Sequence, residues 1–180
     1  MKKTTLPLII LLFTSFLSSA QWPSGVTTVD MNGKDSAVVQ GDMAKGSPMQ
    51  DLSWAWNSAN ACFPGTQAAK FKGNHVFFAV RMAPKSEMFI SVTPTDASAD
   101  LSIYAYRIGA NEYNLVPDLN SCITCEADHK WDRPWKGKVQ TSERHVSFQN
   151  PGTETYNILI GVSGPASATS GTFNLKIKYQ

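Results

Sequence analysis

The stretch Thr172-Phe173-Asn174-Leu175-Lys176-Ile177-Lys178-Tyr179 decides the fold class of this 180-residue chain. Its apolar residues occupy every second position, and its two lysines fall between them. Alternation with a period of two is typical of a β-strand that has one face in the core and the other in water. The stretch therefore predicts a half-buried strand whose core face carries Phe173, Leu175, Ile177 and Tyr179.

Five earlier segments are also expected to be strands. Their β-branched and aromatic residues alternate with polar ones or form short apolar runs bounded by turn residues. No segment after residue 20 keeps the helical spacing of apolar residues over three turns. Many short strands indicate an all-β fold, here an antiparallel, jelly-roll-like β-sandwich. The expected strands are residues 75–82, 87–93, 101–107, 144–149 and 155–162.

The connections between these strands are less regular. Residues 83–86 are expected to form the turn of a hairpin between strands 75–82 and 87–93. Residues 67–72 are a candidate edge strand. Residues 108–142 form a long irregular excursion between two strands. A loop of that length in a compact domain is usually functional or specially held in place.

The first twenty residues have the layout of a secretory signal peptide. Lys2 and Lys3 precede an apolar stretch, and small residues precede a cleavage position before Gln21. We therefore expect a secreted or periplasmic protein that is not inserted in a membrane after cleavage. The two lysines would leave with the peptide, and the remaining 14 basic and 14 acidic residues balance. A neutral chain argues against nucleic acid and anionic lipid as partners.

Several strand motifs carry a resemblance to a known family. They are Val76 to Val80, Phe89-Ile90-Ser91-Val92, Ala99 to Tyr104, Tyr156 to Ile160, and Gly171 to Ile177. The run from Gly73 to Tyr179 that holds them resembles the bacterial pre-peptidase C-terminal domain family. The resemblance implies a jelly-roll-like sandwich without catalytic residues, of a kind that binds polymer, protein or calcium.

The signal peptide and this resemblance together give the expected domain organisation. Residues 1–20 are the signal peptide, and residues 21–66 are an N-terminal extension that packs on the sandwich. Residues 67–180 are the sandwich domain itself.

Three cysteines remain in the exported chain: Cys62, Cys122 and Cys125. Export favours a structural disulfide, in which Cys62 pairs with Cys122 or Cys125 and ties the N-terminal region to the excursion. The C-x-x-C spacing also allows a metal site with His129, for which His145 is a candidate fourth ligand. A redox motif is the third alternative, although no βαβ pattern surrounds it.

The alternating oxygens of residues 96–100 suggest two ligands of a weak calcium site, Asp96 and Asp100. The Gly and Glu that an EF-hand requires are missing, so that class of site is rejected. The alternative, which we favour, is a solvated turn between two strands.

Tryptophans in the excursion are the best binding candidates. Trp131 and Trp135 flank Arg133, and the polar face of the strand 101–107 carries Tyr104 and Tyr106. Exposed aromatic rings beside charged groups stack on sugar rings or form a protein-binding hot spot. The alternative is that the two tryptophans fold down and cap one end of the sandwich, since Trp is highly buried on average.

These observations favour a non-catalytic exported binding module that recognises an extracytoplasmic glycan or protein partner. No set of residues in the sequence marks a catalytic site, so no enzyme activity is expected. No cofactor is expected either, with calcium as the one alternative. Two alternatives stay open. One is a small metal-binding or redox protein that uses Cys122, Cys125 and His129, and the other is a structural accessory subunit of the cell envelope.

Overall fold

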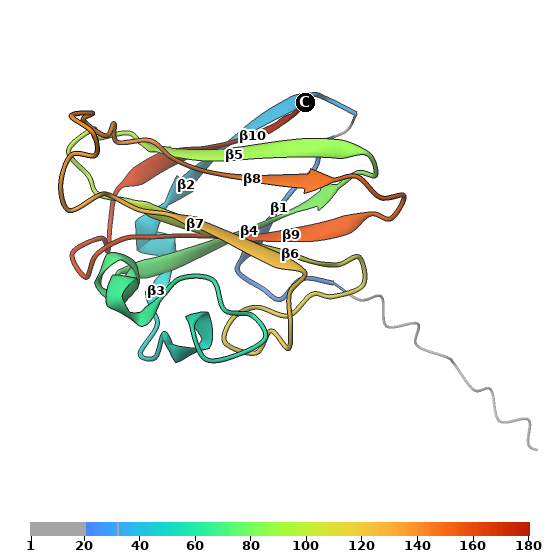
Figure 1. Cartoon of the computed structure of the whole chain (residues 1–180), viewed down its shortest axis with the longest axis horizontal. Helices are drawn as coiled ribbons and strands as arrows, with labels where there is room; N and C mark the ends of the chain where they lie inside the picture. The colour runs from blue at the N-terminus through green and yellow to red at the C-terminus, as the bar shows by residue number, and fades with distance from the viewer. Residues whose placement is uncertain (1–20, 32) are drawn as a thin grey trace, which may run out of the picture.

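The computed structural model describes residues 21–31 and 33–180, which form two β-sheets and a layer of short helices and loops (Figure 1). The signal peptide expected at residues 1–20 lies outside the described residues. Within the described part of the chain, no helix has the length and hydrophobicity needed to cross a membrane.

The described elements are ten strands and three short 3₁₀ helices. The strands are β1 (Val26–Val29), β2 (Ser36–Asp42), β3 (Ser47–Pro48), β4 (Asn74–Met82), β5 (Ser86–Pro94), β6 (Ser102–Gly109), β7 (Thr124–Asp128), β8 (Arg144–Asn150), β9 (Tyr156–Ser163) and β10 (Thr172–Tyr179). The helices are η1 (Met43–Lys45), η2 (Ser53–Ala55) and η3 (Gly65–Phe71).

The two sheets pair strands that are distant in sequence. The larger sheet has the order β1-β4-β9-β6-β7, with β3 paired to β4, and the smaller has the order β2-β10-β5-β8. All neighbours are antiparallel except β1, which runs parallel to β4. The predicted all-β, antiparallel sandwich is confirmed.

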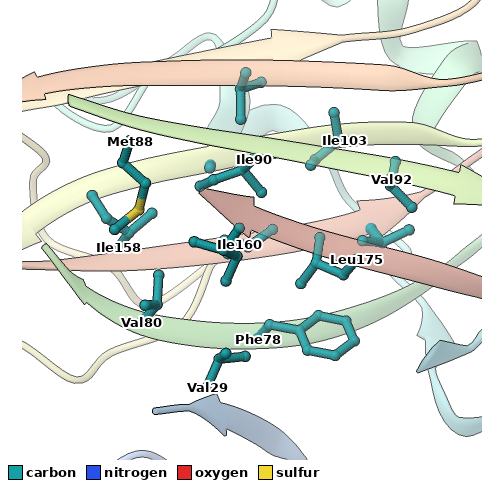
Figure 2. Close-up of a cluster of buried hydrophobic side chains, with 14 of the residues drawn as sticks. Val29, Phe78, Val80, Met88, Ile90, Val92, Ile103, Ile158, Ile160 and Leu175 are labelled. Atoms are coloured by element: carbon teal, nitrogen blue, oxygen red, sulfur yellow. The ribbon is translucent and has the colours of Figure 1, made fainter. Parts of the chain in front are cut away.

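The inner faces of the two sheets form the main core (Figure 2). The alternation of β10 places Phe173, Leu175 and Ile177 in this core with no exposed area. They meet residues of the larger sheet such as Phe78 and Ile160, which are also buried. Burying each such side chain contributes about 1.5–3 kcal/mol, so the facing apolar rows hold the two sheets together.

A second core lies on the other side of the larger sheet. The cover layer, residues 49–71 and 110–123, packs its apolar side chains on the outer face of β6 and β9. Trp54, Phe63 and Phe71 of this layer contact Tyr104 of β6 at ring-centroid distances of 5.5, 6.1 and 6.0 Å. The larger sheet is therefore buried on both faces, whereas the smaller sheet is buried on one.

The N-terminal part of the chain contributes strands to both sheets. β1 pairs with β4 in the larger sheet, and β2 pairs with β10 in the smaller one. Residues 21–66 thus supply strands of both sheets in addition to a part that packs on the sandwich. The boundary at residue 66 stays a prediction.

Three local expectations are corrected by the structure. β4 and β5 do not form a hairpin, because β4 belongs to the larger sheet and β5 to the smaller, so the turn between them crosses from one sheet to the other. Residues 67–72 lie at η3 and its end, with no edge strand there. The excursion 108–142 contains a strand, β7, which pairs with β6.

A disulfide links the cover layer to the larger sheet. Cys62 in the cover layer is bonded to Cys125 in β7, with a Cα–Cα distance of 5.2 Å, and Cys122 is free. This confirms the predicted structural disulfide and selects Cys125 over Cys122. The bond closes a loop of 63 residues.

We expect the double substitution Cys62→Ser and Cys125→Ser to lower the free energy of unfolding by about 4 kcal/mol in the chain-entropy model. Urea unfolding of the mature protein measures it. Cys122→Ser is the matched control and should change the free energy by about 1 kcal/mol or less. A double variant as stable as the control would contradict the assigned role of the disulfide.

Candidate functional site

The candidate site is the loop of residues 129–143 that joins β7 to β8. Trp131 is 38% exposed and Trp135 is 55% exposed, so neither ring caps the end of the sandwich. Their ring centroids lie 6.4 Å apart at an interplanar angle of 69°, which is an edge-to-face contact. The two rings form an exposed aromatic pair.

A tight turn presents Trp135. Trp135 and Lys138 form an isolated antiparallel bridge, and the amide of Lys138 donates to the carbonyl of Trp135 at 2.9 Å. The two residues between them, Lys136 and Gly137, have φ values of 47° and 72°. Positive φ at both central positions is typical of a type I′ turn, which glycine favours. The ammonium group of Lys136 lies 4.4 Å from the centre of the Trp135 ring, a cation–π contact.

Hydrogen bonds and an ion pair hold the rest of the loop. The side-chain oxygen of Gln140 accepts from the amide of Trp131 at 2.7 Å, and its nitrogen donates to the carbonyl of His129 at 3.1 Å. Asp132 forms an ion pair with Lys70 of η3, and this contact lowers the pKa of the Asp132 carboxyl. The loop is therefore positioned from both its own residues and the cover layer.

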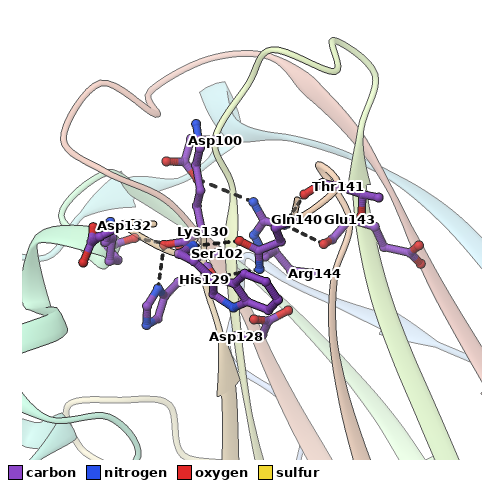
Figure 3. Close-up of polar contacts among 12 residues, drawn as sticks. Asp100, Ser102, Asp128, His129, Lys130, Asp132, Gln140, Thr141, Glu143 and Arg144 are labelled. Atoms are coloured by element: carbon purple, nitrogen blue, oxygen red, sulfur yellow. Dashed lines mark hydrogen bonds and ion pairs between the residues drawn. The ribbon is translucent and has the colours of Figure 1, made fainter. Parts of the chain in front are cut away.

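A buried arginine fixes the point where the loop enters β8. Arg144 is 1% exposed, and its guanidinium donates to the carbonyls of Thr141 and Glu143, each at 2.6 Å (Figure 3). The same guanidinium faces the Asp100 carboxylate at 4.0 Å. Arg144 thus ties the end of the loop to the turn that precedes β6.

A hollow of about 490 Å³ is lined by consecutive loop residues, and we name it the tryptophan hollow. Its lining combines two indole rings with a carboxylate, a guanidinium and a proline. Flat apolar surface next to hydrogen-bonding groups suits a ligand that has both apolar faces and hydroxyl or amide edges. The lining residues are Trp131, Asp132, Arg133, Pro134 and Trp135.

Tyr104 and Tyr106 are not part of this surface. The sequence places them on the polar face of a strand, and the structure buries both completely beneath the cover layer. Gly161 of β9 lies directly opposite Tyr104, and a Cβ atom there would be 2.2 Å from Cζ of the ring. The expectation that these tyrosines bind a ligand is wrong, because the face that was taken as solvated is a second core.

The cysteine and histidine residues do not assemble a metal or dithiol site. Cys125 is committed to the disulfide, and the free thiol of Cys122 is half-buried, which raises its pKa. The imidazole of His129 bonds to the carbonyl of Lys130 at 2.9 Å. In residues 21–31 and 33–180, no three His, Cys, Asp or Glu side chains are arranged to hold a metal ion.

The two aspartates of the proposed calcium loop have protein contacts of their own. Asp96 Oδ1 accepts from the amide and the hydroxyl of Ser98 at 2.9 and 2.8 Å, and these bonds lower the pKa of the Asp96 carboxyl. Asp100 faces Arg144. Asp96 thus caps its own turn and Asp100 faces β8, and the weak calcium site stays a prediction.

Sequence reasoning did not identify Lys70, Gln140 and Arg144 as the residues that hold the loop in place. Lys70 is distant from Trp131 in sequence, and turns separate Arg144 from Trp131. A single polar residue has no sequence pattern that would reveal its contact with the loop. The one signal in the sequence was the Lys136-Gly137 pair, which indicates the turn after Trp135, since glycine at such a position favours a primed turn.

Comparisons with known proteins find similarity of fold only. No protein-family model matches the chain, and neither does any curated protein. The solved structure of CorA, a surface-associated copper-binding protein of Methylomicrobium album BG8, has a TM-score of 0.50 and 12% identity. That match covers 86% of this chain and 98% of CorA. At this identity it shows the fold alone.

Two further structures match at lower TM-scores. The pre-peptidase C-terminal domain of collagenase from Bacillus anthracis has a TM-score of 0.42 and 9% identity, covering 88% of this chain and 99% of its own. PliG, a periplasmic inhibitor of g-type lysozyme from Aeromonas hydrophila, has a TM-score of 0.37 and 13% identity, covering 86% and 97%. One of these two matches is thus a domain of the pre-peptidase C-terminal family.

A buried histidine lies beside Tyr104 of the second core. His75 of β4 is 3% exposed, with Nε2 2.8 Å from the carbonyl oxygen of Phe71 and Nδ1 2.9 Å from the hydroxyl of Tyr104. The carbonyl can only accept, so Nε2 carries the proton and Nδ1 accepts from Tyr104. Burial lowers the pKa of His75 to about 4, although the bond to Phe71 opposes the shift.

This shift predicts a loss of stability on mild acidification. The unfolded chain takes up the His75 proton near pH 6.5 and the folded chain only near pH 4. Stability is therefore full above pH 6.5 and falls as the pH drops toward 4, by about 3 kcal/mol for this group. Urea unfolding between pH 7 and 4.5 measures it, with His75→Gln as the comparison. The same pH dependence in both proteins would contradict the assignment.

Proposed function

We propose that the protein is an exported, non-catalytic binding module that recognises an extracytoplasmic glycan through the tryptophan hollow. The exposure of Trp131 and Trp135 carries the proposal, since aromatic rings of this size are normally packed inside. Trp54 follows that rule, since it is 6% exposed and lies in the second core, and Trp22 and Trp56 are half-buried against that core. Two exposed rings in one loop indicate a surface that is kept for a ligand.

The loop is organised before any ligand arrives. The turn at Lys136 and Gly137, the bonds of Gln140 and the ion pair between Lys70 and Asp132 fix its course. A surface that is already ordered loses less conformational entropy on binding, so more of the contact energy appears as affinity.

The chemistry of the hollow favours a sugar over an apolar ligand. An indole face packs against the C–H groups of a sugar ring, while Asp132 and Arg133 supply an acceptor and donors for its hydroxyls. The Cys62–Cys125 disulfide fits an oxidising compartment outside the cytoplasm, where such polymers occur.

The test is a depletion assay of the mature protein against chitin, cellulose, xylan and peptidoglycan. We expect one of these polymers to bind the wild-type protein, and Trp131→Ala or Trp135→Ala to weaken that binding more than about tenfold. Ile123→Ala is the matched control, because Ile123 is an apolar side chain 50% exposed that lies outside the hollow.

The control should bind as the wild type does. Two outcomes would contradict the proposal: binding that both tryptophan variants retain, or capture of a protein partner whose binding depends on Trp131 and Trp135 while none of the polymers binds. Circular dichroism verifies that the variants are folded, which their surface positions lead us to expect.

A further inference from the structure

The outer face of the smaller sheet is open to solvent. In Figure 1, β10, β5 and β8 form the upper layer, on the side opposite the cover layer. The outward residues of β10 are exposed along its whole length, and those of β8 are exposed as well. This face differs from the corresponding face of the larger sheet, which the cover layer buries.

The strand register arranges basic residues in rows across this face. In one row Ser91 of β5 lies between Lys176 of β10 and His145 of β8. In the next row Phe89 of β5 lies between Lys178 and a serine of β8, Ser147. Side chains that are directly opposite on the same face have Cβ atoms about 4.5–5.5 Å apart. A hollow of about 230 Å³ is lined by Phe89, Ile90, Ser91, Glu143, His145, Lys176 and Lys178.

The two lysines of these rows are not held by ion pairs. None of the ion pairs among residues 21–31 and 33–180 involves Lys176 or Lys178. Of the carboxylates nearby, Glu143 lines the hollow, Glu87 accepts a hydrogen bond from Gln149, and Asp128 lies 3.9 Å from His145. Two like charges on one face repel each other unless a counter-charge lies between them.

The loop that leads into β8 extends this basic surface. Four of its side chains are basic and exposed: Lys130, Arg133, Lys136 and Lys138. Of its two carboxylates, Asp132 is paired with Lys70, and Glu143 lines the hollow beside Ser91. This loop and β10 together hold six of the 14 basic residues in positions 21–180 and two of the 14 acidic ones.

We propose that the outer face of β10, β5 and β8 is a second binding site that takes the acidic groups of an anionic polysaccharide. A carboxylate or sulfate lies over Ser91, where Lys176 and the Ser91 hydroxyl donate to its oxygens. A neighbouring sugar ring packs on the half-buried ring of Phe89, in the adjacent row. Phe89 favours a sugar polymer over a simple anion, because it adds an apolar platform to the charges.

The test measures binding of the mature protein to dextran sulfate, to polygalacturonate and to uncharged dextran. We expect both acidic polymers to bind at low salt and uncharged dextran not to bind. Lys176→Gln with Lys178→Gln should weaken binding about tenfold, since each exposed ion pair contributes up to about 1 kcal/mol. Added salt should weaken the wild-type interaction more than that of the variant.

The matched control removes two charges elsewhere. Lys45→Gln with Lys72→Gln changes two exposed lysines that lie outside this face, and it should bind as the wild type does. Phe89→Ala should weaken binding to polygalacturonate without altering the salt dependence.

Two results would overturn the inference. One is an equal loss in both lysine pairs, which would indicate a response to net charge alone. The other is binding to vesicles of anionic phospholipid that is as tight as binding to the polymers and equally dependent on Lys176 and Lys178. Trp131 and Trp135 lie outside this hollow. The experiments can therefore disprove glycan binding at the tryptophan hollow and still support this second site, or disprove the second site and still support the first.

Discussion

The larger sheet has to be kept dry on both faces, and the rest of the structure depends on that constraint. Its inner face is covered by the smaller sheet, and its outer face carries Tyr104, Tyr106 and Leu159, which are all fully buried. Trp54, Phe63 and Phe71 supply the cover, and the Cys62–Cys125 disulfide holds their segment against the edge strand β7. The cover layer contains no long strand, yet its residues are therefore as much a part of the core as those of the strands.

The same asymmetry decides which surfaces are free to bind. One side of the sandwich is taken by the cover layer, so the outer face of the smaller sheet and the loop at its edge remain accessible. Both free surfaces meet at β8, where the buried Arg144 fixes the loop and His145 begins the exposed row. The cover layer also reaches this loop through the contact of Lys70 with Asp132. The cover layer thus stabilises the larger sheet and also helps to position the loop that carries the candidate site.

The sequence predicts the strands well where one face of a strand meets water. Residues 172–179 alternate strictly, and β10 has those bounds. The tyrosines of β6 show the limit of this reasoning, because alternation tells which residues share a face and does not tell what covers that face. A turn as short as residues 83–86 suggests a hairpin, yet whether the next strand stays in the same sheet is decided by how the two sheets pack.

The candidate site could be predicted only in part. The residues of the tryptophan hollow were identified from the sequence. The loop that presents them is held by contacts with Lys70 and Gln140, which no local sequence pattern indicates. The lysines of β10 were recognised as facing water, and the row that they form with Ser91 and His145 follows from the register of three strands. Register between distant strands is a tertiary property, so it was not accessible from one sequence.

The most direct test of the central claim removes two rings of the cover layer from the mature protein and keeps every strand. The variant is Trp54→Ala with Phe63→Ala, which leaves Tyr104 without both ring contacts. The control is Trp131→Ala with Trp135→Ala, which removes two exposed rings. Urea unfolding followed by circular dichroism compares the two. The account predicts that the cover variant loses about 6 kcal/mol or more of the free energy of unfolding, or does not fold, whereas the control changes by about 1 kcal/mol or less. A cover variant as stable as the control would contradict the account.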